Sequence, residues 1–187
     1  MLTRGSVLGH IFSDGPSAIL HAMKDIVLLV HDIRSTHNVG SLFRTAECLG
    51  VSHLYITGYT PYPVHSTDER LPHIRNKLQS QINKTALGAI ELVAWSHHDD
   101  ITTVIKDLQN SGYTVVGLEQ TSTSTALPEW DPPTKVALLL GREVEGIETS
   151  LMALCDATIE IPQFGKKESL NVVQATAIAL YCAQFAK

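Results

Sequence analysis

The strongest constraint on the fold is a strand, helix and strand pattern near the start of the chain. Residues 26–30 read IVLLV, and the polar stretch 31–37 follows them, as expected for a buried strand and its loop. From Asn38, a good N-cap residue, apolar side chains recur at helical spacing until Gly50, a residue typical of helix ends. A second strand is expected at 53–57. This βαβ unit predicts a parallel sheet with helices on its faces.

The same alternation continues through the rest of the chain and predicts an α/β fold. We expect a mostly parallel sheet of about six strands flanked by helices. Two segments, 60–84 and 121–134, are rich in proline and polar residues and are expected to be loops, which in small domains often carry function. The remaining expected elements are a helix over 99–110 and strands at 91–95, 113–118, 135–140 and 157–161.

The last helix is expected to begin near Ser169, a plausible N-cap, and its sequence SLNVVQATAIALYCAQFA contains no charged residue. A helix that is apolar nearly all round must be buried nearly all round. In a domain of this size, we expect one face to lie at the sheet and another against a partner chain, which predicts a homodimer. The alternative is a helix enclosed on two sides within one chain.

Length and composition predict one soluble domain. The 187 residues suit a single domain over 1–187, in which residues 1–25 are a short extension before the first strand. No segment approaches the roughly 18 apolar residues of a membrane span, and the start lacks a signal peptide, so we expect a cytoplasmic protein without membrane contact. The three cysteines form no CxxC pair and the adjacent His97 and His98 point apart, so we expect neither disulfides nor a metal.

The net charge of −5 argues against a protein that coats nucleic acid through bulk electrostatics. The basic residues are nevertheless unevenly distributed, and a local positive patch is compatible with an acidic chain. Nine of the 14 lie in or beside the loops described next, namely Arg34, Arg44, Arg70, Arg75, Lys77, Lys84, Arg142, Lys166 and Lys167.

Three loops marked by glycine carry the candidate chemistry. They read NVGSLFRTA at 38–46, LLLGREVEG at 138–146, and IEIPQFG followed by KKESLN at 159–171. None is a P-loop, and the GxGxxG spacing of dinucleotide sites is absent. Asn38 and Arg44 could hold a phosphate or a ribose, but each loop alone also allows a purely structural explanation.

Together, in this order and spacing, the loops resemble the three motifs of the SpoU/TrmH family of SPOUT methyltransferases. The resemblance runs from about residue 26 to the C-terminus, and it includes KTALGA at 84–89 and GLE at 117–119. It implies a deep trefoil knot in the C-terminal part, S-adenosylmethionine as cofactor, and methyl transfer to the ribose 2′-hydroxyl of an RNA. tRNA is favoured over rRNA because the family's minimal members include tRNA enzymes. No separate RNA-binding domain is expected in this chain.

The resemblance also implies residue roles. Arg44 would act at the reaction centre, and we favour phosphate binding and alkoxide stabilisation over proton abstraction because a guanidinium rarely loses its proton. Asn38, Glu143 and Asn171 match the other polar residues of the three motifs and would shape the substrate pocket. The residues expected to bind the cofactor are Leu118, Glu119, Leu140, Gly141, Ile161, Gln163, Ser169 and Leu170.

Two departures from the family pattern concern the second and third motifs. Arg142 stands where asparagine or proline is common, and Asn171 is followed by Val172, Val173 and Gln174 instead of valine and serine. Two other functions stay open: a knotted RNA-binding protein that has lost catalysis, and a small-molecule methyltransferase or nucleotide enzyme. A groove shared by Arg44 and the basic residues of segment 60–84 would favour an RNA substrate. The expected RNA contacts are Arg34, Arg70, Arg75, Lys77 and Arg142, with a solvated surface as the alternative.

Overall fold

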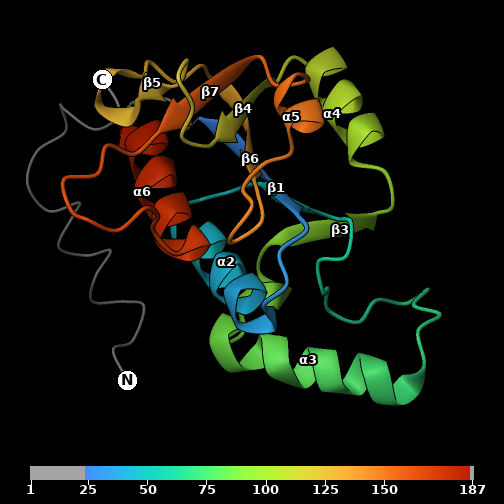
Figure 1. The fold of residues 1–187 in the computed structure, drawn as a ribbon. Coiled ribbons are helices and arrows are strands. Elements are labelled where there is room, and N and C mark those ends of the chain that lie inside the picture. Colours follow the sequence, from blue (N-terminus) through green and yellow to red (C-terminus); the bar gives the residue numbers. More distant parts are fainter. Residues whose placement is uncertain (1–23, 186–187) are drawn as a thin grey trace, which may run out of the picture.

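The structure is a computed structural model and describes residues 24–185 of the chain. Its centre is a seven-stranded sheet in which every pairing is parallel, with the order β3-β2-β1-β6-β4-β7-β5 (Figure 1). The α/β class is thereby confirmed. The strands are β1 (Asp25–His31), β2 (His53–Thr57), β3 (Ala94–His98), β4 (Thr114–Leu118), β5 (Thr125–Ala126), β6 (Lys135–Leu140) and β7 (Ala157–Glu160).

Helices cover both faces of the sheet. Alternate residues of β1 enter two separate cores: Leu28 packs in the core that contains residues of α2, α3 and α6, and Leu29 in the core that contains residues of α4 and α5. Figure 1 shows α2, α3 and α6 on one side and α4 and α5 on the other. The helices are α2 (Thr36–Cys48), α3 (Pro72–Ala86), α4 (Ile101–Asn110), α5 (Thr149–Met152) and α6 (Val172–Phe185), with short 3-10 turns η1 (Ala89–Glu91) and η2 (Leu127–Glu129).

The structure corrects three of the expected elements. The segment 60–84, expected to be a loop, contains most of helix α3, which begins at Pro72 and buries only Ile82 and Ala86. So few buried positions leave little apolar periodicity in the sequence. The strand expected at 91–95 is displaced to β3, and β5, a strand of two residues, lies in the other expected loop and raises the number of strands to seven.

Two expected helix starts are also wrong by a few residues. Ser35, not Asn38, is the N-cap of α2, because its hydroxyl accepts a hydrogen bond from the Asn38 backbone amide at 3.2 Å. At α6, the Asn171 side chain accepts from the Val173 amide at 2.9 Å, so this helix begins after Asn171 and not near Ser169. Asn38 therefore lies in the first turn of α2, and Asn171 lies directly before α6.

Parallel pairing brings the carboxyl ends of the strands to one edge of the sheet. Val30 of β1 lies opposite Leu140 of β6, and Leu118 of β4 lies opposite Ile159 of β7. The loops that follow these strands are therefore neighbours, although they are far apart in the sequence. Ligand sites of open parallel sheets are typically found at this edge.

Several expectations remain predictions. The trefoil knot is one, and the single-domain organisation is another. The expected extension 1–25 lies almost entirely outside the described residues. In the described part of the chain, no helix combines the length and the apolar character needed to cross a membrane.

Helix α2 carries a glycine, Gly40, because α3 lies too close for any side chain. A Cβ at this position would lie 2.2 Å from the Ile82 carbonyl oxygen and 2.2 Å from the Thr85 hydroxyl oxygen. We expect Gly40→Ala to lower the free energy of unfolding by about 1–3 kcal/mol, because α3 must move away. Gly165→Ala is the matched control, since no atom lies within 4 Å of its Cβ position. Urea unfolding that shows equal stability for both variants would contradict the close helix contact.

Candidate active site

A cavity of about 270 Å³ lies at the carboxyl ends of β4, β6 and β7. Its volume is near the lower end of the range for ligand pockets, roughly 300–1,000 Å³. The loops after all three strands contribute to its wall, together with the first turns of α6. All eight residues expected to bind the cofactor line it: Leu118, Glu119, Leu140, Gly141, Ile161, Gln163, Ser169 and Leu170.

The lining combines apolar side chains with carboxylates. Leu118, Leu140 and Ile161 are apolar surfaces against which a flat ring can pack. The carboxylates give the cavity a negative character, which favours a ligand that carries positive charge. Four of them line the cavity, namely Glu119, Glu143, Glu160 and Glu168. S-adenosylmethionine, with an adenine ring and a sulfonium cation, fits this chemistry.

The loop 141–147, which follows β6, is folded tightly against itself. The backbone amides of Arg142 and Gly146 donate to each other's carbonyl oxygens at 3.1 and 3.2 Å. A Cβ on Gly141 would lie 2.5 Å from the Ile147 nitrogen, so only glycine allows this approach. Glu119, from the loop after β4, accepts a hydrogen bond from the Ile147 amide at 2.9 Å. The neighbouring loop thus fixes the far end of loop 141–147.

The polar residues of the three motifs meet at Asn38, in the first turn of α2. Its side-chain amide donates to a carboxylate oxygen of Glu143 at 3.1 Å, and its side-chain carbonyl accepts from the Asn171 amide at 3.4 Å. Glu143 also accepts from the backbone amides of Arg34 and Ser35, each at 3.4 Å. Glu143 lines the cavity, so this cluster lies at its wall.

Ser35 was not among the expected site residues. Its hydroxyl accepts from the Asn38 backbone amide and its own amide donates to Glu143, so it holds Asn38 and Glu143 next to each other. The sequence contained one signal for it, because serine three residues before Asn38 is a frequent N-cap.

Arg44 is not part of this cluster. It is exposed, one and a half helical turns beyond Asn38, and it lines a separate groove together with Lys84 of α3 and Ala177 of α6. Among the described residues, Arg44 makes no hydrogen bond or ion pair. Its guanidinium is therefore available to a phosphate, as is the ammonium group of Lys84 beside it.

The remaining basic residues differ in how far they are already engaged. Lys77 is exposed on α3, and Arg34 is mostly exposed while it pairs with Glu145 at 3.1 Å. Arg75 donates to the Asp68 carbonyl oxygen at 2.9 Å. These three stay candidate RNA contacts, although none of them lines the groove of Arg44.

Arg70 and Arg142 have internal partners instead. Arg70 pairs with the buried carboxylate of Asp68 at 2.5 Å and lies 3.6 Å from the centre of the Tyr62 ring. Arg142 pairs with Asp32 at 3.1 Å and also with Glu148. Asp68 is only two residues from Arg70, whereas Asp32 is 110 positions from Arg142 and could not be revealed as its partner by the sequence. These contacts leave both guanidinium groups largely committed to the fold.

The histidines hold no metal site in the described part of the chain, where no group of three or more His, Cys, Asp or Glu side chains could bind a metal ion. His97 stacks on Tyr62, and His98 accepts or donates a hydrogen bond with the Ser96 hydroxyl at 2.8 Å. Burial lowers the pKa of His97 and of His53, so both side chains favour the neutral form.

The sequence matches a family model over nearly its whole length: the model of the SpoU rRNA Methylase family covers residues 25–181. The chain belongs to this family. The family predicted from the three motifs is thereby confirmed. The roles of the individual residues stay predictions.

Two curated SpoU-type relatives act on different RNAs. The chain is 26% identical over 162 residues to the tRNA (guanosine(18)-2'-O)-methyltransferase of Aquifex aeolicus. This match covers 86% of the chain and 69% of the relative. It is 28% identical over 160 residues to the 23S rRNA (guanosine-2'-O-)-methyltransferase RlmB of Xanthomonas axonopodis pv. citri, with 86% and 58% covered. Other curated relatives are covered to between 9% and 74% of their length.

The SpoU-type fold is also shown by solved structures. The crystal structure of the AdoMet-bound rRNA methyltransferase from Sinorhizobium meliloti superposes with a TM-score of 0.72, at 24% sequence identity, over 86% of this chain and 56% of that chain. At this identity the similarity establishes the architecture of the sheet and helices.

The pairing of Arg70 with Asp68 predicts a pH-dependent stability. Hydrogen bonds from Arg70 lower the pKa of Asp68 to about 2. A carboxyl whose pKa is lower in the folded state stabilises the fold above its unfolded pKa of about 3.9, and the effect is lost as the pH falls toward 2. We expect Arg70→Gln to reduce the free energy of unfolding by about 3 kcal/mol at pH 7, because it leaves a buried carboxylate without its cation.

The measurement is chemical unfolding of both proteins from pH 7 to pH 2. The difference between wild type and Arg70→Gln should shrink below pH 4 as Asp68 becomes protonated. A smaller, pH-independent part should remain at pH 2, because Arg70 also donates to the Tyr62 and Pro63 carbonyl oxygens. Lys77→Gln, which removes an exposed cation from α3, should leave stability within about 0.5 kcal/mol. A constant difference at every pH would show that Asp68 and Arg70 do not form this pair in solution.

Proposed function

We propose that the protein is an S-adenosylmethionine-dependent methyltransferase that acts on a ribose 2′-hydroxyl of RNA. The observation that carries this proposal is the convergence of the three family motifs at Asn38. The Glu143 and Asn171 side chains reach it from loops more than 100 residues away, at the wall of a cavity suited to the cofactor. A chain that had lost this function would have no need to hold three polar side chains in such mutual contact.

The cavity at the strand ends is the proposed cofactor site. Leu118, Ile161 and Leu170 would flank the adenine, while backbone groups of the loops and the carboxylates would hold the polar parts. S-adenosylmethionine supplies an activated methyl group bound to a positively charged sulfur. The crystal structure from Sinorhizobium meliloti was solved with AdoMet bound, which supports this cofactor here.

We assign Arg44 to the reacting ribose, and the RNA would have to extend from the cofactor cavity to the separate groove that Arg44 lines. The 2′-hydroxyl must lose its proton as its oxygen forms the bond to carbon, and negative charge develops on that oxygen. A guanidinium stabilises this charge and binds a neighbouring phosphate without giving up its own proton. Lys84 lies in the same groove and adds a second cation for the RNA backbone.

An RNA substrate is favoured over a small molecule by the open groove that Arg44 shares with Lys84. Of the two RNA classes we favour tRNA, because the Aquifex aeolicus relative is a tRNA methyltransferase and is covered to 69% of its length. rRNA is the alternative, supported by the Xanthomonas relative. We infer a cytoplasmic location, which a role on either RNA supports.

We further propose a homodimer that forms through α6. The helix has a buried stripe on one side, and an apolar exposed stripe that contains Ile178, Tyr181 and Phe185 on the other. Tyr181 is 59% exposed and Phe185 is 56% exposed, so this stripe lacks cover within the described chain. A second copy packed there would also lie beside Ala177 and therefore beside the groove of Arg44.

The activity is tested by transfer of labelled methyl groups from S-adenosylmethionine to tRNA and, separately, to rRNA. The product should be a 2′-O-methylated nucleoside, identified by mass spectrometry. We expect Arg44→Ala to lower kcat by roughly 100-fold or more, because the developing charge loses its main stabilising group. Arg44→Lys should retain part of the activity, since it keeps the charge but not the planar fork.

Lys106→Ala is the matched control, because Lys106 is an exposed cation on the opposite face of the sheet. It should leave kcat and KM unchanged. Methylation of a base instead of a ribose, or full activity of Arg44→Ala, would refute the mechanism. Binding of S-adenosylmethionine without transfer to either RNA would favour the catalytically inactive RNA-binding protein.

The dimer is tested by Tyr181→Arg, which places a charge in the centre of the exposed stripe. We expect sedimentation equilibrium to show a dimer for the wild type and a monomer for the variant, because a buried charge without a partner opposes association. Leu92→Arg is the control, because Leu92 is 57% exposed and lies after η1, away from α6. A variant that stays dimeric would exclude this face of α6 as the interface.

A further inference from the structure

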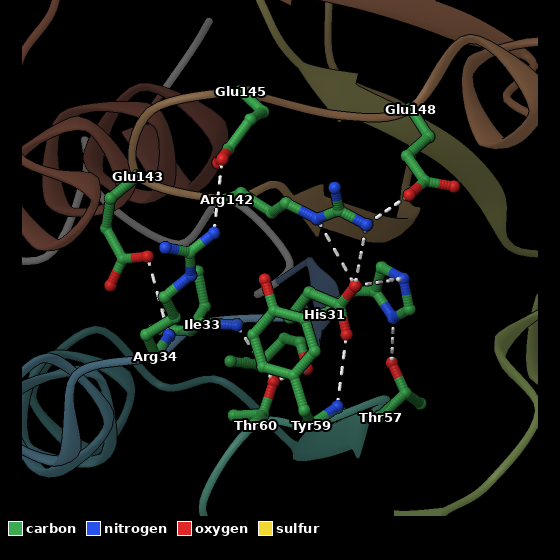
Figure 2. Close-up of polar contacts among 12 residues, drawn as sticks. His31, Ile33, Arg34, Thr57, Tyr59, Thr60, Arg142, Glu143, Glu145 and Glu148 are labelled. Carbon is green, nitrogen blue, oxygen red and sulfur yellow. Dashed lines mark hydrogen bonds and ion pairs between the residues drawn. The ribbon is translucent and has the colours of Figure 1, made fainter.

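Arg142 lines the cavity and is held between two carboxylates (Figure 2). It follows Gly141 directly and precedes Glu143. Its guanidinium donates to the same oxygen of Asp32 through Nε at 3.3 Å and through Nη2 at 3.1 Å, and Nη2 also donates to Glu148. The sequence suggested an RNA contact for Arg142, but these partners point its side chain into the protein.

Asp32 is well suited to hold such a cation. It is 6% exposed and adopts a left-handed backbone conformation with a φ of 55°, directly after β1. Its second carboxylate oxygen accepts from the Tyr59 amide at 3.0 Å, and its own amide donates to the Thr57 carbonyl at 3.4 Å. Gly58 allows this approach, because a Cβ there would lie 1.9 Å from the Asp32 carboxylate. The carboxylate is therefore fixed to both β1 and β2.

Loop 141–147 has four side-chain attachments, and Arg142 provides the one to the buried Asp32 after β1. Glu145 provides another, an exposed ion pair with Arg34 at 3.1 Å. Glu119 holds its end at Ile147, and Glu143 is held by Asn38. The attachment through Asp32 ties the loop to the end of β1, the strand next to β6 in the sheet. Because Gly141 lines the cavity and Glu143 contacts Asn38, a displacement of Arg142 would move both neighbours.

We propose that Asp32 and Arg142 are positioning residues, which fix loop 141–147 and thereby align Gly141 at the cavity and Glu143 at Asn38. This inference rests on the proposed function as far as cofactor binding and turnover are concerned. The ordering of the loop itself does not depend on that function.

The test uses the full chain and the variants Asp32→Asn, Arg142→Gln, Arg142→Lys and the double variant Asp32→Asn with Arg142→Gln. Calorimetry with S-adenosylmethionine gives its Kd, and amide hydrogen exchange of residues 142–147 reports loop order. We expect each single variant to raise the Kd or lower kcat by on the order of 100-fold, because small misplacements near a reacting centre have effects of this size. The double variant should be no worse than either single one, since both remove the same contact. Arg142→Lys should recover part of the loss.

Asp25→Asn is the matched control. Asp25 lies at the other end of β1, where its carboxylate accepts from the Tyr113 and Ser52 hydroxyls at 2.5 and 2.7 Å. The Asp25→Asn substitution removes a charge from β1 without changing any contact of loop 141–147. Cofactor binding and exchange of residues 142–147 should match the wild type.

A further readout is independent of both ligands. Burial lowers the pKa of His31, Asp32 and Glu148 raise it, and Arg142 lowers it. Nε2 of His31 lies 3.5 Å from Asp32. NMR titration should therefore show a higher His31 pKa in Arg142→Gln and a lower one in Asp32→Asn. Values unchanged in both variants would overturn the pairing.

Two results would reject the positioning role. One is an Arg142→Gln variant that binds S-adenosylmethionine normally, keeps its slow loop exchange, and loses RNA affinity with a weaker salt dependence, which would make Arg142 an RNA contact. The other is additive losses in the double variant. If the wild type binds no S-adenosylmethionine, the proposed function fails, and the loop exchange of the variants still decides this inference.

Discussion

The rest of the structure depends on the burial of β1 from both sides. Its residues 26–30 are at most 2% exposed and alternate between two apolar cores, so the strand can occupy only the middle of the sheet. Removal of this apolar surface from water is the main stabilising contribution. With β1 fixed and every neighbour parallel to it, the chain has one edge at which its functional loops can gather.

The sequence predicted those parts of the fold in which local pattern and tertiary packing agree. The strands 53–57 and 135–140 were predicted to the residue, since each is a compact apolar run between polar turns. Helix α3 was missed, because only Ile82 and Ala86 of its 15 residues are buried and the hydrophobic period is weak. Leu87, in the left-handed C-cap of α3, is an unusual residue for that position and gave no end signal.

The candidate site shows the same division between local and distant information. The eight expected cavity residues share one cavity, because each stands within or just after a strand end or in the loop before α6. What the sequence could not show is pairing between distant charges. Arg142 and Asp32, for example, are 110 positions apart. Such pairs arise only when the loops are brought together by the sheet.

The long separations within the Asn38 cluster have a consequence for how the protein is made. The bond between Asn38 and Asn171 spans 133 positions, so the last contributor leaves the ribosome long after the first. Closing such distant contacts is slow compared with forming local helices. We infer that the nascent chain can build the β1, α2 and β2 unit early, whereas the Asn38 cluster forms later. An incomplete chain would therefore be partly folded yet inactive toward RNA.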